Sequence, residues 1–424
     1  MHISEIKSEL LNEKYYKVKH DSGLTIYVYP KEGYSSTYAI FGTKYGSINN
    51  AFRVDNKDVV RVPDGIAHYL EHKLFESEDG DAFSRYAKTG ANANAYTSFD
   101  KTCYLFSCTD NFEDSLEILL DFVQSPYFTE ETVAKEQGII GQEIKMYDDS
   151  PSWRVMFNML MNMYHAHPVR IDIAGTVESI AEITPEYLYT CYNTYYNLNN
   201  MVLCVCGNTT LDTVLSIADK MLKKNEYHKI ENIFEDEDDS VVSPYVEQCL
   251  PVGLPLFNLG FKEKAGKKRP DVKTLACSEI LLFLLASSTS TLYRKLMDEN
   301  LINASFSYEY MEGEGFLATI FSGESHDPKK VATIIKDYIQ QMKKTGISEE
   351  EFEIAKRATY GDCIAALNST DHIANLMADF YFSDREIFEY IDAISDATLD
   401  DVTDRLNNMF DIEKSTLSVI KNAE

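Results

Sequence analysis

Residues 65–76 read "GIAHYLEHKLFE", which places His68 and His72 four residues apart with Glu71 directly before the second histidine. On an α-helix, positions four apart lie on one face, one turn from each other. Both imidazoles can therefore reach a single metal ion, while Glu71 lies beside that face, within reach of a water molecule on the metal. An ordinary amphipathic helix with a surface histidine pair is the alternative that this motif alone leaves open.

The motif lacks a third ligand, because a catalytic zinc site takes three protein ligands and leaves the fourth position to water. The segment 129–149, "TEETVAKEQGIIGQEIKMYDD", predicts a helix that carries Glu136 and Glu143 on one face beside several isoleucines. Glutamates on a helix usually face solvent. Two acids beside an apolar stripe nevertheless favour a role in the histidine site.

These residue types match the chemistry of metal-assisted peptide hydrolysis. Zinc lowers the pKa of its water and polarises the carbonyl, and a free carboxylate takes the proton and passes it to the leaving amine. Glu71 suits this second role because it lies outside the ligand set. His165 and His167 form an H-x-H that could bind metal across a strand, although a loop or helix-end position is the better interpretation.

The chain repeats its own pattern. Residues 184–208, "TPEYLYTCYNTYYNLNNMVLCVCGN", align without gaps with residues 398–422, "TLDDVTDRLNNMFDIEKSTLSVIKN", and each segment predicts a helix, a turn and a strand. Residues 128–137 and 347–356 both carry a Ser or Thr cap at their second position (Thr129 and Ser348) followed by acids, the signal of a capped helix start. We interpret these similarities as an internal duplication.

An acidic run at 223–244 lies between the two copies and predicts a solvated linker. We therefore predict an N-terminal half-domain with the metal site at 1–222 and a non-catalytic C-terminal repeat at 245–424. Strand patterns such as 24–30 and 102–108 come in adjacent sets followed by pairs of helices. This order favours an α+β fold in each half over a doubly wound α/β fold.

Composition excludes several classes of partner. The 424 residues include 40 basic and 68 acidic ones, a formal net charge of −28, and nucleic acid or an anionic membrane needs clustered Lys and Arg. No apolar run approaches the roughly 18 residues of a membrane span.

The eight cysteines form no C-x-x-C pair, and the N-terminus lacks the apolar region of a secretory signal. We expect reduced, buried thiols in a cytoplasmic protein.

On these motifs the sequence resembles the pitrilysin/insulinase family of zinc peptidases, the inverzincins, with H-x-x-E-H and a later helix carrying two glutamates seven apart. The resemblance implies one Zn²⁺ per chain, ligated by His68, His72 and Glu143, with Glu71 as general base and Glu136 as a supporting acid. It covers essentially the whole chain. It also implies two homologous α/β-sandwich half-domains, each an antiparallel-rich sheet flanked by helices, in the LuxS/MPP-like metallohydrolase fold.

Within the family, the length and the two-fold repetition are similar to the two-half processing-peptidase class, and "EHKLFE" and "GIIGQE" are similar to the bacterial YmfH-like subgroup. The stretch "GANANAYTSFDKTCYLFSC" (90–108) resembles the family's edge strand, along which a peptide substrate adds as an extra strand. The resemblance therefore implies that Asn94 and Ala95 contact the substrate.

One departure from the family pattern concerns an arginine and a tyrosine that active members carry in the second half. In "LMDENLINASFSY" (296–308) the matching positions are Met297 and Asn303, with Arg294 and Tyr308 nearby but out of register. We expect a partner chain to supply the missing pair. That chain would be a zinc-less homologous subunit in a heterodimer enclosing a chamber, with a homodimer as the alternative. The weaker alternatives are that Arg294 or Tyr308 substitutes for the missing pair, or that activity is low.

The sequence therefore predicts a zinc metalloendopeptidase acting on peptides or unfolded and leader segments. A non-catalytic, partner-binding homologue of the family is the second interpretation. The intact base and ligand set argue against it, because a scaffold needs neither. An unrelated peptide-binding module is the third, and stoichiometric zinc would exclude it.

Overall fold

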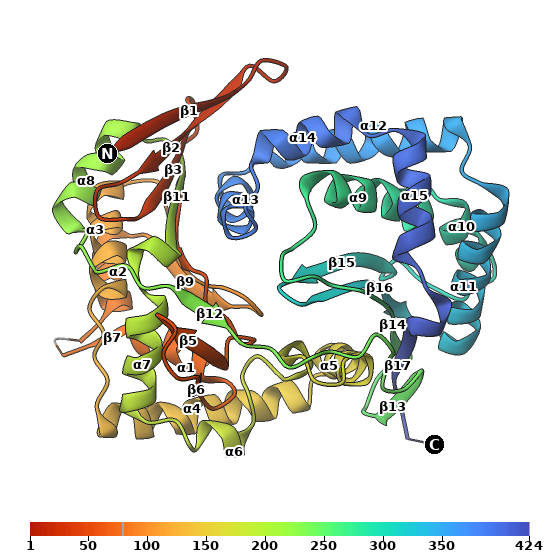
Figure 1. The fold of residues 1–424 in the computed structure, drawn as a ribbon, viewed down its shortest axis with the longest axis horizontal. Helices are drawn as coiled ribbons and strands as arrows, with labels where there is room; N and C mark the ends of the chain where they lie inside the picture. Colours follow the sequence, from red (N-terminus) through yellow and green to blue (C-terminus); the bar gives the residue numbers. More distant parts are fainter. Residues whose placement is uncertain (79, 424) are drawn as a thin grey trace. The chain divides into compact units, whose positions relative to one another are not determined.

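The computed structural model describes residues 1–78 and 80–423 and divides them into two compact units (Figure 1). Unit 1 comprises Met1–Ile144, Asp172–Ile233 and Ala366–Phe388. Unit 2 comprises Lys145–Ile171, Phe234–Ala365 and Glu389–Glu424. Each unit therefore takes segments from both ends of the chain. The sequence boundaries 1–222, 223–244 and 245–424 concern the repeat, not the packing, and stay a prediction.

In the described residues, unit 1 is built on a seven-stranded mixed sheet with the order β1-β2-β3-β11-β4-β10-β9. Only β3 and β11 run parallel, and all other neighbours are antiparallel. The strands are β1 (His2–Ser8), β2 (Glu13–Lys19), β3 (Thr25–Pro30), β4 (Thr37–Thr43), β9 (Asn92–Thr97), β10 (Thr102–Cys108) and β11 (Met201–Gly207). The central strands are buried apolar runs, whereas β9 at the sheet edge is partly exposed.

Helices and two small sheets complete unit 1. The helices are α1 (Ile66–Leu74), α2 (Ala82–Thr89), α3 (Phe112–Val123), α4 (Glu130–Asp148, which continues into unit 2), α6 (Val177–Ile180), α7 (Pro185–Tyr195), α8 (Leu211–Met221) and α13 (Thr370–Phe382), with the 3-10 turn η2 (Leu198–Asn200). The small sheets pair β5 (Ala51–Val54) with β6 (Val60–Arg61) and β12 (Ile230–Asn232), and β7 (Glu76–Ser77) with β8 (Gly80–Asp81).

Unit 2 contains a five-stranded sheet, counted over the described residues, with the order β13-β17-β14-β16-β15. The strands are β13 (Tyr245–Cys249), β14 (Leu256–Glu263), β15 (Ser307–Gly313), β16 (Phe316–Glu324) and β17 (Ser415–Lys421). Its helices are α5 (Pro151–Met163), α9 (Val272–Ala286), α10 (Thr291–Asp298), α11 (Pro328–Thr345), α12 (Glu349–Ala366), α14 (Ile387–Asp396) and α15 (Leu399–Met409), with the turns η1 (Pro168–Arg170) and η3 (Ile412–Lys414).

The two sheets confirm the internal duplication and the α+β class. The order β3-β11-β4-β10-β9 has the same pattern as β13-β17-β14-β16-β15, with one parallel pair at the start of each series. The aligned segments 184–208 and 398–422 form α7-η2-β11 and α15-η3-β17, with matching element boundaries. Thr184 and Thr398 cap the two helices by accepting hydrogen bonds from backbone N–H groups.

Each sheet is covered by a helix that lies far from its strands in the sequence. Helix α13 packs on β4 and β11 in unit 1, where Figure 1 shows it beside β11, and α5 packs on β14 and β17 in unit 2. The contact needs a small residue at one position of each sheet. A Cβ on Gly42 would lie 3.2 Å from Phe382, and one on Gly260 would lie 2.3 Å from Met163. A side chain at either glycine would push the covering helix away.

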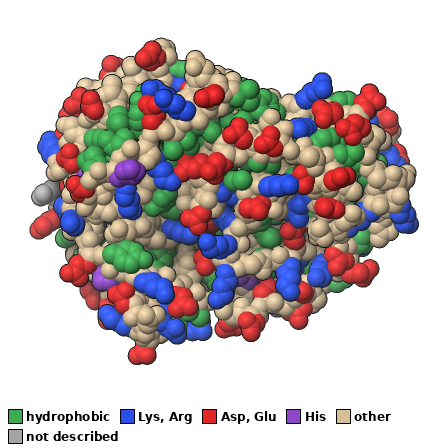
Figure 2. All heavy atoms as spheres, turned by 45° about the horizontal axis from the view of Figure 1, so that its top comes forward, with side chains coloured by type: hydrophobic (Ala, Val, Ile, Leu, Met, Phe, Trp, Pro, Cys, Tyr) green, Lys and Arg blue, Asp and Glu red, His purple; other side chains and the backbone are tan. Residues whose placement is uncertain are grey.

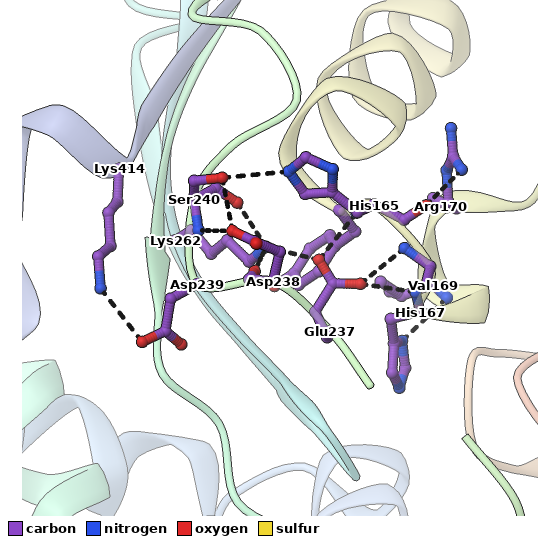
Figure 3. A network of polar contacts seen from close by, with 12 residues as sticks. His165, His167, Val169, Arg170, Glu237, Asp238, Asp239, Ser240, Lys262 and Lys414 are labelled. Atoms are coloured by element: carbon purple, nitrogen blue, oxygen red, sulfur yellow. Dashed lines mark hydrogen bonds and ion pairs between the residues drawn. The ribbon is translucent and has the colours of Figure 1, made fainter. Parts of the chain in front are cut away.

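The segment predicted as a solvated linker makes specific contacts in unit 2 (Figure 3). Glu237 accepts backbone hydrogen bonds from His165, Ala166 and His167 at 2.7–2.8 Å. The buried Lys262 ammonium on β14 donates to Glu237 at 2.6 Å and to two linker carbonyl oxygens. An acidic residue at this point therefore attaches the linker to the sheet and to the loop after α5.

Apolar segments are mostly buried, and charged side chains lie on the surface. The helical segment Val272–Asp298 has the length and composition of a membrane span, but 72% of its apolar window is buried. It is therefore the core of unit 2. Over the face drawn in Figure 2, acidic side chains are interspersed with Lys and Arg. All eight cysteines are free, and six of them are buried.

Candidate metal centre

The motif helix α1 begins at a glycine that the backbone requires. Gly65 has φ +87°, and a Cβ there would lie 2.3 Å from the carbonyl oxygen of Ala174. The opposing Gly175 also has positive φ, and Ser179 donates a hydrogen bond to the Asp64 carbonyl at 2.8 Å. This close approach of two chain segments fixes where α1 starts, and with it the direction in which the histidines point.

A second contact ties α1 to α4, the helix that supplies the carboxylates. The Tyr69 hydroxyl donates a hydrogen bond to the backbone carbonyl of Val133, and Tyr69, Leu70 and Leu74 are buried. The apolar side of α1 thus packs into unit 1. The side that carries His68 and His72 faces the middle of α4.

His68, His72 and Glu143 converge on one point. His72 Nε2 lies 3.4 Å from Glu143 Oε2, and His68 Nε2 lies 3.8 Å from Glu143 Oε1. One donor atom from each residue lies within 4.8 Å of the others, and this is the one such group of three or more in residues 1–78 and 80–423. The structure therefore brings together the three residues that the sequence predicts as ligands.

The donor set fits zinc. Two nitrogen atoms and one carboxylate oxygen are a catalytic zinc ligand set, and ligands about 2.1 Å from a tetrahedral ion lie about 3.4 Å apart. The 3.4 Å separation of His72 Nε2 from Glu143 Oε2 matches that spacing, and the 3.8 Å separation of His68 Nε2 from the other oxygen of Glu143 is slightly longer. His68 is 7% exposed, and its Nδ1 atom has no hydrogen-bond partner. Its Nε2 atom, 3.8 Å from Glu143, is the ring nitrogen turned toward the shared point.

Glu136 acts on His72 from outside this ligand set. Its Oε1 atom lies 3.0 Å from His72 Nδ1. A carboxylate bound to the far nitrogen of a ligating histidine fixes the tautomer and the ring orientation. His72 Nδ1 carries the hydrogen, and Nε2 is left as the metal donor. This contact is the one that the predicted supporting role of Glu136 requires, and that role stays a prediction.

Glu71 lies beside the ligands and accepts a hydrogen bond from a residue of the 90–108 stretch to which the sequence assigned no role. It is 9% exposed, and Thr97 Oγ1 donates a hydrogen bond to its Oε2 at 2.9 Å. Thr97 was visible only as the last residue of the "NANAYT" strand. A threonine in a strand carries no signal that it faces a helix distant in sequence.

Burial and neighbouring charge set the protonation of the site. Burial lowers the pKa of His68 to about 4, which favours the neutral, ligating imidazole. Burial also lowers the pKa of His72, but the Glu136 hydrogen bond and the surrounding carboxylates outweigh it and raise the value overall. For Glu71, burial raises the pKa, and the charge of His72 and the Thr97 hydrogen bond offset part of that rise.

Asn94 and Ala95 lie on β9, the edge strand next to α1. Asn94 pairs with Leu105 and Ala95 with Tyr104 on β10, and in the described chain no strand lies on the other side of β9. The Ala95 N–H donates to the Asn94 side chain at 2.9 Å. An edge with a free side is what strand addition by a peptide requires, and the substrate role of both residues stays a prediction.

In the second half, the two positions that match the family's arginine and tyrosine hold other residues, and the nearby Arg294 and Tyr308 are engaged elsewhere or lie at the sheet edge. Met297 is 38% exposed, and Asn303 donates to Glu324 at 2.7 Å. Arg294 donates to the Thr289 carbonyl just before its own helix, and Tyr308 lies on the edge strand β15.

The H-x-H pair lies in a loop, as the sequence favoured. His165 and His167 follow α5, and they contact the Ser240 hydroxyl and the Glu314 carbonyl, respectively.

A sheet that carries the H-x-x-E-H helix at its edge, completed by a glutamate from a second helix, defines a class: the zinc peptidases with an inverted motif. Comparison with known proteins gives the family within that class. Residues 57–177 match Insulinase (Peptidase family M16), and residues 182–359 match the Peptidase M16 inactive domain. The chain belongs to the M16 family of insulinase- and pitrilysin-like zinc proteases, and the family prediction is confirmed.

Similar proteins cover nearly the whole chain. The uncharacterized zinc protease YmfH of Bacillus subtilis strain 168 is 42% identical over 412 residues, which is 94% of this chain and 95% of that protein. A putative M16-like peptidase from Alicyclobacillus acidocaldarius has a TM-score of 0.93 at 34% identity, covering 96% of this chain and 98% of that one. A Helicobacter pylori protease has a TM-score of 0.82 at 23% identity over 96% and 99%, which supports the fold alone.

Proposed function

We propose that this protein is a zinc-dependent endopeptidase acting on peptides, including unfolded or leader segments. The observation that carries the proposal is the convergence of His68, His72 and Glu143 with a non-ligating Glu71 on the same helix. The match to zinc proteases supports it. The enclosing chamber implied by the family resemblance belongs to the same proposal and would select substrates by size and extended conformation.

Bound zinc would supply the chemistry of a Lewis acid, activating water and polarising the substrate carbonyl. The remaining steps belong to this chain. Glu71 accepts a proton from the attacking water and donates it to the nitrogen of the leaving amine. The oxygen that does so is Oε1, because Thr97 holds Oε2. Asn94 and Ala95 on β9 align the substrate backbone.

A partner subunit is the second part of the proposal. The positions of the family's arginine and tyrosine hold Met297 and Asn303, and the nearby Arg294 is bonded to the Thr289 carbonyl. We propose that a zinc-less homologous chain supplies both missing side chains in a heterodimer. A homodimer is the alternative arrangement. The free, mostly buried cysteines support a cytoplasmic location.

A non-catalytic, partner-binding homologue is the competing function, and the same missing arginine and tyrosine favour it. Measurement of peptide cleavage distinguishes a peptidase from a non-catalytic homologue. A scaffold would bind zinc or a partner without cleaving peptide, and its Glu71 could be replaced without consequence.

The test measures bound zinc and the cleavage of an unstructured peptide library, with the chain alone and with a zinc-less homologue from the same genome. Glu71→Gln is expected to retain zinc and lose turnover. Full activity in that variant would refute the mechanism. A monomeric chain that is as active alone as in any mixture would refute the partner subunit.

A further inference from the structure

Thr97, the last residue of β9, carries the hydroxyl that contacts Glu71. We propose that Thr97 is a positioning residue for the peptidase reaction: its hydrogen bond holds one oxygen of the Glu71 carboxylate so that the other faces the reacting water. The contact is 2.9 Å from Oγ1 to Oε2. This inference rests on the proposed function and deepens it.

The Glu71 carboxylate needs a hydrogen bond from another residue to fix its orientation, because it is not a metal ligand. The side chains of His68, His72 and Glu143 bring one donor atom each within 4.8 Å of the others, and a bound ion would fix them. A glutamate has three side-chain torsions, and a metal leaves those of Glu71 free. A catalytic group displaced by about 1 Å can cost a hundred-fold in rate. The Thr97 hydroxyl is the one donor to this carboxylate found among the described residues.

Thr97 can serve as a fixed donor because β10 locks it in place. It pairs with Thr102, whose hydroxyl lies 3.4 Å from that of Thr97. Thr102 is fully buried and donates to the Tyr45 carbonyl at 2.8 Å. A β-branched side chain also has few χ1 choices in a strand. The donor is therefore built on a rigid element rather than on a loop.

Strand β9 carries both Thr97 and the residues proposed to contact the substrate. Asn94 and Ala95 precede Thr97 by two or three residues on β9. A peptide added along this edge would take its position from the strand that also orients Glu71. One rigid element then sets the distance between the substrate backbone and the base, whichever side chains the substrate carries.

The second half shows the same meeting point with different chemistry. The strand registers make Tyr310 the counterpart of Thr97, because Tyr310 pairs with Thr319 on β16 as Thr97 pairs with Thr102 on β10. Pro270-Asp271 precedes α9 as Pro63-Asp64 precedes α1, which makes Ser278 the counterpart of Glu71.

Buried Arg405 joins these two counterparts. It donates to Ser278 at 2.7 Å and to the Tyr310 hydroxyl at 3.0 Å. In both halves the edge-strand residue at this register, Thr97 or Tyr310, therefore lies at the helix position of Glu71 or its counterpart. In the second half an arginine fills the space, and in the first half the threonine contacts a free carboxylate.

The test replaces Thr97 with the isosteric valine and with serine in the full-length protein. Thr97→Val is expected to lower kcat roughly ten- to a hundred-fold, with KM, zinc stoichiometry and Tm near wild type, because a hydrogen bond to a charged group is lost. Thr97→Ser should recover most of kcat. Ser98→Ala is the matched control, because it removes a hydroxyl that bonds only within the adjacent turn. It should leave kcat unchanged.

A second readout does not depend on turnover. A peptide hydroxamate binds zinc and gives a proton to an adjacent carboxylate, so its affinity measured by calorimetry reports the placement of Glu71. Thr97→Val should weaken it about ten-fold, and Thr97→Ser should not. Wild-type protein that binds the hydroxamate but cleaves no peptide would refute the proposed function while leaving this comparison intact.

Three results would overturn the role of Thr97. One is a valine variant with wild-type kcat and hydroxamate affinity. Another is a serine variant as impaired as the valine variant, which would show that strand packing matters rather than the hydroxyl. The third concerns Glu71→Asp, in which the shortened base has already lost its alignment. The Thr97→Val change should then add no further loss, so independent, multiplying losses would show that Thr97 does not act through Glu71.

Discussion

Removal of Glu136 should weaken zinc binding without removing a ligand. The carboxylate lies 3.0 Å from His72 Nδ1 and is only 14% exposed, so solvent does not replace it. A hydrogen bond with a charged partner contributes about 1.5–3 kcal/mol, and loss of such a supporting group lowers metal affinity about ten- to a hundred-fold. Glu136→Leu should therefore raise the Kd for zinc by that factor.

Glu136→Gln should have a smaller effect, because its amide oxygen can still accept the His72 hydrogen. The assay is competition for zinc against a chelator of known affinity. All variants are measured at one pH, so that the affinity of the chelator for zinc is the same in each titration. Glu131→Gln is the control, because this exposed residue in the first turn of the same helix loses the same charge far from His72. It should leave the Kd unchanged.

A Glu136→Leu variant that binds zinc as tightly as wild type would contradict this role of Glu136. In that case the histidine ring would be fixed by packing alone, and the hydrogen bond would be incidental. A Glu131→Gln variant that weakens zinc binding as much as Glu136→Leu would also contradict it. That result would show that net charge on α4, not the contact with His72, sets the affinity.

Three further outcomes are expected. Gly65→Ala should lower the free energy of unfolding by more than about 1–2 kcal/mol, because alanine disfavours φ +87° and its Cβ would meet a carbonyl 2.3 Å away. Gly138→Ala, in open space on α4, should raise it by about 0.5–1 kcal/mol in the same denaturant titration. Lys262→Met should destabilise unit 2 by about 3–5 kcal/mol and expose the linker to limited proteolysis, because the ammonium is 4% exposed and paired. Lys264→Met, whose partner is 3.8 Å away and whose side chain is 79% exposed, should leave the proteolysis pattern unchanged. Burial lowers the pKa of His167 from 6.5 to about 4, so the unfolded chain binds a proton first as pH falls. The free energy of unfolding of the wild type, measured by urea titration, should fall by up to about 3 kcal/mol more than that of His167→Gln between pH 6.5 and pH 4. An equal fall in the two proteins would contradict this.

Sequence spacing predicted the parts of the site that follow from one helix. His68, Glu71 and His72 needed only the 3.6-residue period, and Glu136 and Glu143 needed only the seven-residue repeat on a second helix. The family resemblance joined the two helices, and the convergence on Glu143 confirms that they meet. Periodicity is local, so it could state which face each residue occupies but not which faces touch.

The internal repeat was also visible in the chain. The Thr caps at 184 and 398 and the strands that follow them match position by position, because the same local signals start both helices. The family resemblance already implied an edge strand within residues 90–108, and the position of β9 at the end of the sheet confirms it. The parallel pairing of β3 with β11 followed only from the structure. Strand order depends on which segments pair, and the period of a single strand carries no information on its neighbour.

The sequence by itself therefore determined the family, the duplicated α+β halves and the candidate zinc ligands. Motif spacing placed His68 and His72, and the family resemblance added Glu143. Only the tertiary structure decided that Thr97 holds Glu71, that Glu237 attaches the linker through Lys262, and that α5 and α13 cover sheets distant in the chain. These contacts depend on close packing between segments far apart in sequence. Small residues such as Gly42 and Gly260 permit that packing, but nothing in their neighbours reveals it.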